Sequence, residues 1–442
     1  MPPNWKFTPD YYRRCLNVLA TALNECSAYK SWRDFDPGQG YPADVRYASL
    51  PSLTKEDIRE HFPDGFVPPE CDLKRALENG DVWFVTTSGT VDLMVTNIWN
   101  QKWWDASERA SWKLNSYADK LCTGNHPEAI LANPRNVGFI SDTDDLPFEK
   151  RRWGRFLYLN EKTSPLLWTP ELMDRMVKEL NIFRPVVLEA NPSLLANLCR
   201  HIAATGKTVY QPGLIVLTYE YPTIFHYRQF RKVFDSPIAN SYGSTETGYV
   251  FEECEAGKLH QNTAFCRVDL QPLKPEHGGP ELCRILTTPF NNSWYYLLRF
   301  DVSDLVRIDT SGKCPCGRDD GIILSNIEGR AANCTLTTGG RLVTQYELDK
   351  AVSILQNVDE YQLDQDTADS YILRLVSQLN NKDALTKDAV AVLKNLYGKE
   401  AKVTVIYEEA LGPETSGKYR ISRANFPIDI ENYLDERFIV KK

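Results

Sequence analysis

The chain lacks the features that direct proteins to membranes, secretion or nucleic acid. It has no uninterrupted apolar stretch long enough to span a bilayer. The segment Met1–Lys6 lacks the apolar core of a secretory signal. No long basic run is present, and the net charge of −8 argues against nucleic acid or an anionic membrane as the main partner. We therefore expect a cytoplasmic protein that binds neither nucleic acid nor membrane.

Densely and regularly spaced cysteines are also absent. The 11 cysteines are an odd number, which favours reduced thiols in a cytosolic setting over a disulfide framework. There is no internal repeat and no low-complexity segment. The length of 442 residues, with 42% hydrophobic and 25% charged residues, is typical of a soluble globular protein with two or three domains.

The predicted secondary structure alternates between strands and helices. β-branched residues predict strands at 184–188 and 214–218, with a helix at 193–204 between them. This alternation favours a largely parallel α/β core. Near the start, residues 8–30 have a helical pattern, and Thr54 with Asp57 predicts a capping box that begins another helix.

The pattern changes after Gly329-Arg330. Shorter helices and strands follow, predicted at 346–355, 371–376, 387–397 and 402–407. They form an α+β unit large enough to be an independent domain. We therefore predict an α/β protein with a large N-terminal α/β domain, residues 1–329, and a small mobile C-terminal α+β domain, residues 330–442.

A hydroxyl-rich loop follows a predicted buried strand at 82–86. Its residues Thr87, Ser88, Gly89 and Thr90 combine hydroxyls with the backbone amides of a glycine-containing turn. Such a loop can hold phosphate oxygens. It is not the lysine-bearing loop of common NTPases, and taken alone it is more typical of an ordinary polar turn.

Three later motifs could complete a nucleotide site. Tyr242 to Glu246 places an aromatic ring, a glycine, a hydroxyl and a carboxylate in one loop, and Glu246 could hold Mg²⁺. Asp301 and Asp304 lie beyond a predicted strand end, where a carboxylate could accept both ribose hydroxyls. Gly417-Lys418 supplies a basic loop near the end of the chain. Each motif also has a structural interpretation: a turn, an Asp-capped strand end and a surface loop.

Cysteine and histidine form a further candidate site. Cys314-Pro315-Cys316 resembles a metal-binding turn, and Cys254 and His260 supply a third thiol and an imidazole. A Cys₃His set is a closed tetrahedral site for structural zinc. The spacing is not that of a standard zinc finger, and unrelated free thiols remain the alternative.

In this order and over this length, the motifs resemble those of the adenylate-forming (ANL) superfamily. They are most similar to its phenylacetate–CoA ligase branch. The supporting segments are Leu50–Lys55, Asn191-Pro192-Ser193, Tyr242–Glu246, Glu253–Glu255, Leu259-His260, Cys314–Arg318 and Ile327–Arg330. The similarity covers nearly the whole chain.

The resemblance implies a role for each residue. Thr87, Ser88, Gly89 and Thr90 would bind the ATP phosphates, and Tyr242 would flank adenine, with Tyr219 and Glu220 nearby. Gly243 and Ser244 would also belong to the nucleotide site. Asp304 would bind the ribose with help from Arg330. Thr245 would contact the α-phosphate, Glu246 the Mg²⁺, and Lys418 the α-phosphate and substrate carboxylate. Cys254, His260, Cys314 and Cys316 would hold a structural zinc ion.

Four departures indicate a divergent member of that branch. Val91-Asp92 stands where the phosphate loop usually has another glycine, and it places an acid near phosphate. Tyr219 replaces the glycine of the adenine segment. The segment Asp301–Asp304 lacks its usual glycine, and Asn333 stands in place of the hinge acid.

The implied reaction is activation of a carboxylic acid by ATP with release of pyrophosphate. The acyl-adenylate would then react with CoA, or alternatively with a carrier protein or an amine, and a non-catalytic homologue is the remaining alternative. The resemblance implies an aromatic acid, for which Phe139, the segment around Asn240, and Tyr249 are candidate pocket walls or else core residues. It also leaves a homodimer open.

Overall fold

A computed structural model describes residues 5–86, 94–414 and 419–440. The chain divides into two compact units, which we treat separately. Unit 1 contains Met1–Ser116, Ser241–Ile327 and Ile430–Lys442, and unit 2 contains Tyr117–Asn240 and Glu328–Asp429. The predicted boundary at residues 329 and 330 stays a prediction. Within the described residues, no helix has the length and apolarity needed to cross a membrane.

Unit 1 begins with a set of helices. Thr8 and Pro9 begin α1 (Pro9–Glu25), whose apolar side packs into the core of this unit. The predicted capping box is confirmed: Thr54 and Asp57 bond reciprocally at the start of α3 (Lys55–His61). The other helices of this part are η1 (Ser27–Asp34), α2 (Ala43–Ala48), η2 (Asp64–Phe66), α4 (Leu73–Asn79) and α5 (Gln101–Trp112). The helix α6 (Ser116–Leu121) begins at the last residue of this segment, and the rest of it belongs to unit 2.

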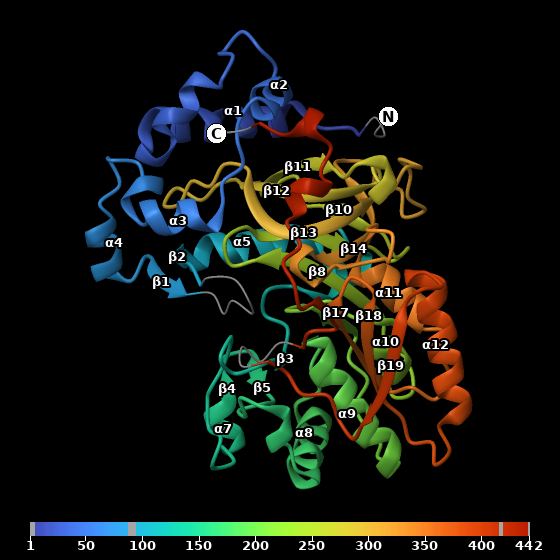
Figure 1. Ribbon diagram of the computed structural model, residues 1–442. Coiled ribbons are helices and arrows are strands. Elements are labelled where there is room, and N and C mark those ends of the chain that lie inside the picture. The colour runs from blue at the N-terminus through green and yellow to red at the C-terminus, as the bar shows by residue number, and fades with distance from the viewer. Residues whose placement is uncertain (1–4, 87–93, 415–418, 441–442) are drawn as a thin grey trace. The chain divides into compact units, whose positions relative to one another are not determined.

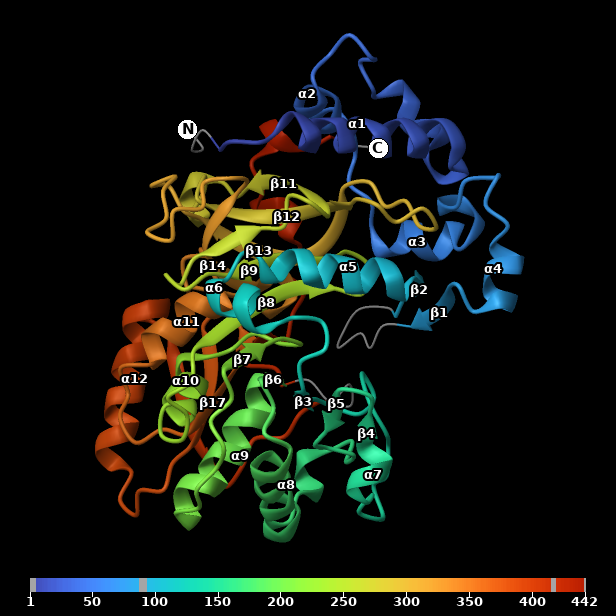
Figure 2. The same ribbon diagram turned by 180° about the vertical axis from the view of Figure 1, so that it is seen from behind.

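Later in the chain than these helices come the strands that form the sheet of unit 1. Its strand order is β11-β12-β13-β14-β10-β9-β8, with the residues of β8 from Ser241 onward belonging to this unit. Pairs of neighbouring strands are antiparallel wherever their register is known. The helix α5 lies against β9 (Figure 2). The strands are β8 (Ile238–Ser244), β9 (Gly248–Glu253), β10 (Leu259–Gln261), β11 (Cys266–Pro272), β12 (Leu282–Pro289), β13 (Phe300–Ile308) and β14 (Ile323–Arg330).

The first part of unit 2 contains the predicted parallel sheet. The strands β3 (Glu128–Leu131), β5 (Phe156–Tyr158), β6 (Val187–Ala190) and β7 (Leu214–Leu217) are parallel, and β4 (Arg152–Trp153) is an antiparallel edge strand. The helices α8 (Pro170–Phe183) and α9 (Pro192–Thr205) contribute with these strands to one apolar core (Figure 1). The α/β prediction is confirmed.

Residues 328–429, which we call the insert, form the second part of unit 2. Its sheet has the order β19-β18-β17-β20. The insert packs against α10 (Ile224–Phe230), because Phe225 belongs to the insert's apolar core. Its elements include β15 (Thr335–Leu336), β16 (Leu342–Val343), α11 (Gln345–Val352), β17 (Glu360–Thr367), β18 (Ser370–Val376), α12 (Asp383–Tyr397), β19 (Lys402–Glu408) and β20 (Ser422–Ala424).

Three local predictions were wrong. The helix predicted at 8–30 ends at Glu25, where a 3₁₀ segment follows. The strand β1 (Trp83–Thr86) is not buried, because it pairs only with β2 (Thr96–Trp99) in a two-stranded sheet. Asp301 and Asp304 lie within β13 and not beyond a strand end.

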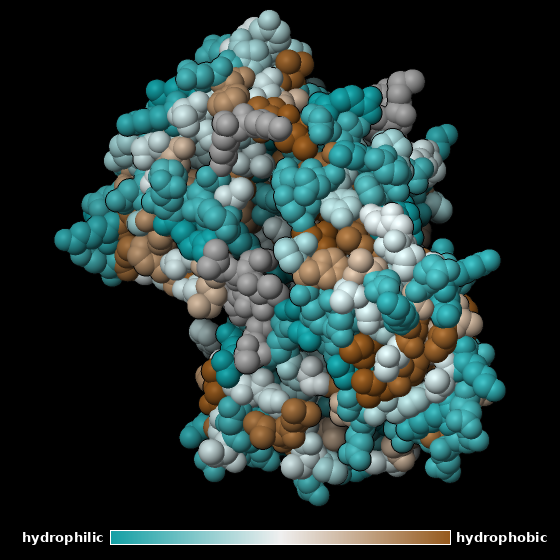
Figure 3. Space-filling view, in the orientation of Figure 1, coloured by the Kyte–Doolittle hydropathy of each residue, from teal (hydrophilic) through white to brown (hydrophobic). Residues whose placement is uncertain are grey.

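On the face drawn in Figure 3, hydrophobic residues form separate patches among hydrophilic ones.

Candidate functional site

Two predicted nucleotide residues meet in unit 1. The hydroxyl of Tyr242 on β8 donates a hydrogen bond to Asp304 Oδ2 on β13 at 2.8 Å. These residues are 62 positions apart in the chain. The ring of Tyr242 packs against the core of unit 1, which fixes its direction. The fold therefore joins the predicted adenine residue to the predicted ribose ligand.

The turn between β8 and β9 requires glycine. A Cβ on Gly243 would lie 2.1 Å from the carbonyl oxygen of Gly248, so no larger residue fits here. The turn closes through a 3.1 Å hydrogen bond from Thr247 N to Ser244 O. Thr245 and Glu246 are held in this turn, and Glu246 is buried with 6% exposure.

Two residues of the predicted nucleotide segments, Tyr219 and Ser303, are among the non-glycine residues with a positive φ. Tyr219, in the turn after β7, has φ 77°, and Ser303 in β13 has φ 64°. Both residues lie in segments where the resemblance leads us to expect a glycine. Positive φ is readily adopted by glycine and costs other residues about 1–2 kcal/mol. The backbone at Tyr219 and Ser303 therefore has a conformation that glycine adopts readily.

The side chain of Tyr219 turns to the neighbouring strand of unit 2. Its hydroxyl donates a hydrogen bond to the carboxylate of Glu189 on β6. Burial and the nearby negative charge of Glu128 raise the pKa of Glu189 to about 7. The hydrogen bond from Tyr219 and the positive charge of Arg155 lower this pKa, but by less.

Glu220 makes a second polar contact in unit 2. Its carboxylate accepts hydrogen bonds from Ser193 N at 3.0 Å and from Tyr419 N at 3.3 Å. Burial raises the pKa of Glu220. The contact ties the predicted adenine segment to the residue that directly follows Lys418.

The predicted hinge residues also lie in unit 2. Arg330 is the last residue of β14, and a short 3₁₀ turn, Ala331–Asn333, follows it. Gly329 has φ 96°, and a Cβ there would meet the side chain of Gln345 at 2.6 Å. Asn333 donates to the same glutamine at 3.3 Å and accepts from Ser422 Oγ at 2.7 Å.

Some predicted residues lie outside the described part of the chain. These are Thr87, Ser88, Gly89 and Thr90 with Val91-Asp92, and Gly417-Lys418. Their roles stay predictions from the sequence.

The four predicted zinc ligands converge in unit 1. Cys254 Sγ lies 3.6 Å from Cys314 Sγ, and Cys316 Sγ lies 3.3 Å from His260 Nε2. All four ligand atoms lie within 4.8 Å of one another. Zinc–sulfur bonds of 2.3 Å and zinc–nitrogen bonds of 2.0–2.1 Å in a tetrahedron place neighbouring ligand atoms about 3.5–3.8 Å apart. The donor set and its spacing therefore fit a four-coordinate zinc ion.

Two turns hold these ligands. Cys254 and His260 come from the β9–β10 hairpin, which closes with Cys254 N bonding to Lys258 O at 2.8 Å. The second turn closes with Gly317 N bonding to Cys314 O at 3.0 Å. The side chain of Arg318 then bonds to Glu255 at 3.0 and 3.1 Å, which links the two turns.

Unit 1 contains a row of aromatic rings that the sequence analysis did not predict. The rings of Trp99 and Trp104 lie 4.4 Å apart, and those of Trp104 and Tyr249 lie 5.0 Å apart. Tyr249 pairs across the sheet with Gly243 of the Tyr242–Glu246 motif. All three rings are half-buried. The residues come from β2, α5 and β9, so no local pattern could have shown that they meet.

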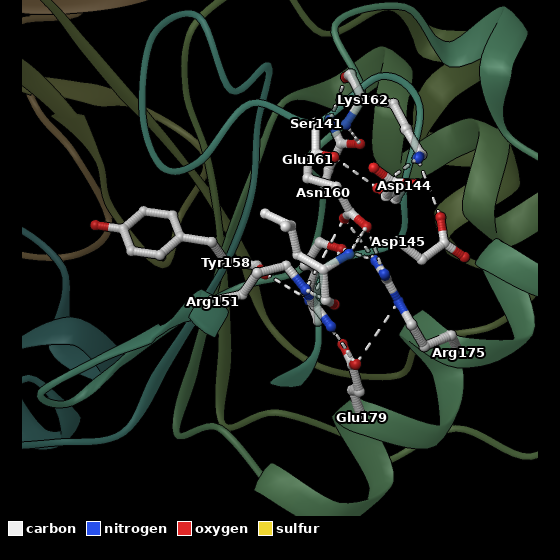
Figure 4. Close-up of polar contacts among 12 residues, drawn as sticks. Ser141, Asp144, Asp145, Arg151, Tyr158, Asn160, Glu161, Lys162, Arg175 and Glu179 are labelled. Atoms are coloured by element: carbon white, nitrogen blue, oxygen red, sulfur yellow. Dashed lines mark hydrogen bonds and ion pairs between the residues drawn. The ribbon is translucent and has the colours of Figure 1, made fainter. Parts of the chain in front are cut away.

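Phe139 belongs to unit 2, where its loop is firmly held. Its ring packs edge-on against Tyr158 at 5.9 Å. A network of buried charges holds the loop that follows it (Figure 4). In this network Glu161 accepts from Leu146 N at 3.2 Å, and its backbone carbonyl accepts from Ser141 N at 2.9 Å. Asn240 bonds to Tyr227 OH at 2.7 Å in the same unit, as expected of a structural residue.

Comparisons with known proteins give a consistent fold. No family model matches the chain. The curated protein CapK of Staphylococcus aureus is 25% identical over 252 residues, which is 56% of this chain and 55% of CapK, so the match spans about half of that protein.

Solved structures match over more of the chain. A 2-hydroxyisobutyryl-CoA ligase in the postadenylation state with 2-HIB-AMP aligns with 93% of this chain and 88% of its own, at a TM-score of 0.67 and 15% identity. This chain has the adenylate-forming fold. The same ligase with 2-HIB-AMP and CoA in the thioesterification state gives a TM-score of 0.53, with 15% identity over 94% and 89% of the chains. The amide bond synthetase McbA of Marinactinospora thermotolerans gives 0.50, with 11% identity over 77% and 67%.

Proposed function

We propose that this protein activates a carboxylic acid with ATP as an acyl-adenylate, releases pyrophosphate, and transfers the acyl group to a nucleophile. The observation that carries the proposal is the contact between Tyr242 and Asp304, which joins two motifs that the reaction needs in one place. The fold is the second support. Fold alone does not give function, so the residues must supply the argument.

In the first step the substrate carboxylate attacks the α-phosphorus of ATP and pyrophosphate leaves. Two negatively charged groups approach each other, so catalysis consists of positioning and charge stabilisation. Asp304 would bind the ribose and Thr87–Thr90 the outer phosphates. Thr245 would contact the α-phosphate, and Lys418 would stabilise the charge that develops there.

Two metal ions enter the proposal. Glu246 would hold Mg²⁺, which neutralises phosphate charge when bound; a buried carboxylate in a tight turn is a suitable ligand. Cys254, His260, Cys314 and Cys316 would hold zinc. That site has four protein ligands and no open position, so its role would be structural.

The acid is proposed to be aromatic. The half-buried rings of Trp99, Trp104 and Tyr249 support this class, because they lie beside the Tyr242–Glu246 turn in unit 1. Aromatic rings favour stacked or edge-on contact with another ring. A planar acyl group would gain such contacts with its carboxylate directed toward the turn.

The acceptor is proposed to be CoA. The ligase named above is recorded with CoA, and McbA makes amide bonds, so an amine or a carrier protein is the alternative acceptor. After adenylation, the small domain would turn about Arg330–Asn333, withdraw Lys418 and admit the acceptor. Closure would also keep water from the reactive adenylate.

Pyrophosphate exchange tests the first step. Labelled pyrophosphate should enter ATP only when a suitable acid is present, and a panel of aryl, aliphatic and hydroxy acids should show the strongest exchange with aryl acids. Lys418→Ala is the matched control of low activity. No exchange with any acid, from protein that is folded and binds ATP, would favour the non-catalytic alternative raised by Val91-Asp92. Mass spectrometry of products formed with CoA, amines and carrier proteins identifies the acceptor.

A further inference from the structure

The segment that follows the insert returns to unit 1. Residues 430–440, which we call the strap, contain two short 3₁₀ turns, Ile430–Tyr433 and Glu436–Phe438. In Figure 1 the strap is the red segment that runs beside β11 and β12. The insert thus lies between two segments of unit 1, with Ile327 before it and Ile430 after it.

Backbone hydrogen bonds attach the strap beside the end of the edge strand β11. Leu434 forms an antiparallel bridge with Leu273. Lys274 N donates to Tyr433 O, and Asp435 N donates to Pro272 O, both at 2.9 Å. Edge strands present unpaired backbone groups, which another segment of chain can satisfy. The strap satisfies the carbonyl of Pro272, the last residue of β11, and the N–H of Lys274, which lies just beyond it.

Side chains add apolar and charged contacts. Leu434 has 0% exposure, and the ring of Tyr433 packs edge-on against His277 at 4.7 Å. Glu431 forms an ion pair with the buried guanidinium of Arg284. Arg284 also contacts Asp301 at 3.2 Å. A buried cation with two carboxylate partners is costly to separate from either one.

We propose that the strap anchors the C-terminal end of the insert to unit 1, so that the insert moves on two linkers and not on one. A domain connected by a single linker could swing freely about residues 328–333. Here the end of β20 is joined to the strap by residues 425–429 alone. A fully extended chain rises at most about 3.3–3.6 Å per residue, so Ala424 can move no more than about 20 Å from Ile430. The moving part would be residues 328–429, once their contacts with α10 have opened.

The decisive variant lengthens this second linker without touching the strap. Ten Gly/Ser residues are inserted between Asp429 and Ile430, and spin labels are placed at the exposed residues Lys30 of unit 1 and Lys399 of the insert. Labels are introduced as unnatural amino acids because the chain has 11 cysteines. We expect a wider label-to-label distance distribution after the insertion. The same insertion after Gly40, an exposed turn of unit 1, should leave the distribution unchanged.

A second variant releases the strap itself. Leu434→Asp should widen the same distribution and abolish the slow hydrogen exchange expected at Asp435 N and Lys274 N. Arg437→Ala, a change at an exposed strap residue, should alter neither measurement. An unchanged distribution after the linker insertion would overturn the proposal, as would unprotected strap amides in the wild-type protein. The measurements need neither nucleotide nor acid, so their outcome is independent of the proposed reaction.

Discussion

The hydroxyl of Tyr219 donates a hydrogen bond to the carboxylate of Glu189, which lies on the adjacent parallel strand of unit 2. Tyr219 holds a backbone conformation that suits glycine, at an expected cost of about 1–2 kcal/mol. A hydrogen bond to a charged or partly charged acceptor contributes about 1.5–3 kcal/mol. The side-chain contact is therefore of the right size to offset the backbone strain at Tyr219.

Glu189→Gln should change how stability depends on pH. The folded pKa of Glu189 is about 7, above its ordinary value of 4.5, because of burial and the charge of Glu128. Between these values the unfolded chain releases the proton and the folded chain keeps it, so stability falls as pH rises from about 4.5 to 7. The loss is at most about 3 kcal/mol, because one pKa unit corresponds to about 1.4 kcal/mol.

Thermal unfolding of both proteins at pH 4.5 and 8 measures this effect. As pH rises, the melting temperature of the Gln variant should increase relative to that of the wild type, since an amide does not titrate. A constant difference across this range would show that Glu189 ionises normally. Tyr219→Phe is the second arm: loss of the donor should move the wild-type transition to higher pH.

Asp304→Ala should weaken ATP binding. If the carboxylate accepts both ribose hydroxyls, loss of these hydrogen bonds costs at least about 1.5–3 kcal/mol, which is about 10- to 100-fold in affinity. Calorimetric titration with a non-hydrolysable ATP analogue measures it. Tyr242→Phe is the matched control, because it removes only the 2.8 Å contact with Asp304 and keeps the ring. Equal affinities in Asp304→Ala and wild type would remove Asp304 from the site.

Local patterns in the sequence predicted much of the fold. The capping box of Thr54 and Asp57 is a contact within four residues, so its chemistry is fully visible in the sequence. The parallel strands β6 and β7 were expected from short β-branched runs separated by a helix. The zinc set was expected because thiol and imidazole ligands are few and chemically distinct.

The features that the sequence did not predict depend on packing between segments that are distant in the chain. The ring row of Trp99, Trp104 and Tyr249 joins three elements, and aromatic residues are common in any core. The strand position of Asp304 depends on pairing with β12 and β14, which no local pattern encodes. The docking of the strap could not be predicted either, because the partners of Leu434 and Glu431 lie more than a hundred residues earlier in the chain.

Lys418→Ala should slow adenylate formation by orders of magnitude with ATP affinity nearly unchanged. The proposed role of this cation is in the transition state, where charge develops at the α-phosphate, so loss of it should affect the rate and not ground-state binding. Pyrophosphate exchange and nucleotide titration separate the two effects. Exchange at the wild-type rate would exclude Lys418 from catalysis.

The purified protein should contain about one zinc ion per chain. Cys316→Ser should lower both metal content and melting temperature, because metal binding to the folded site contributes folding free energy. Cys71→Ser is the control, since Cys71 is a free, half-buried cysteine outside the four-ligand set. Elemental analysis of all three proteins, prepared without chelators, decides the matter. A stable native protein without metal would refute the site.

The last prediction concerns the buried charges of unit 2, and it can be tested without a ligand. Arg151 has 0% exposure, and its guanidinium bonds to Glu179, to Leu146 O at 3.0 Å and to Tyr158 O at 2.8 Å (Figure 4). Glu179→Gln removes the charge of its partner and leaves a buried cation less compensated. Breaking such a pair costs about 3–5 kcal/mol when one partner is lost, although replacing both partners with apolar residues can be neutral.

Urea unfolding should therefore show a large loss of stability in Glu179→Gln. The matched control is Lys402→Ala, which breaks an ion pair with Asp369 whose side chains are 74% and 41% exposed. That change should cost less than about 1 kcal/mol, because water screens the charges in both states. The double variant Arg151→Met with Glu179→Leu should recover part of the loss, since it removes the buried cation together with its partner. Equal effects of Glu179→Gln and Lys402→Ala would mean that water reaches Arg151 and that the network of Figure 4 does not fix the loop after Phe139.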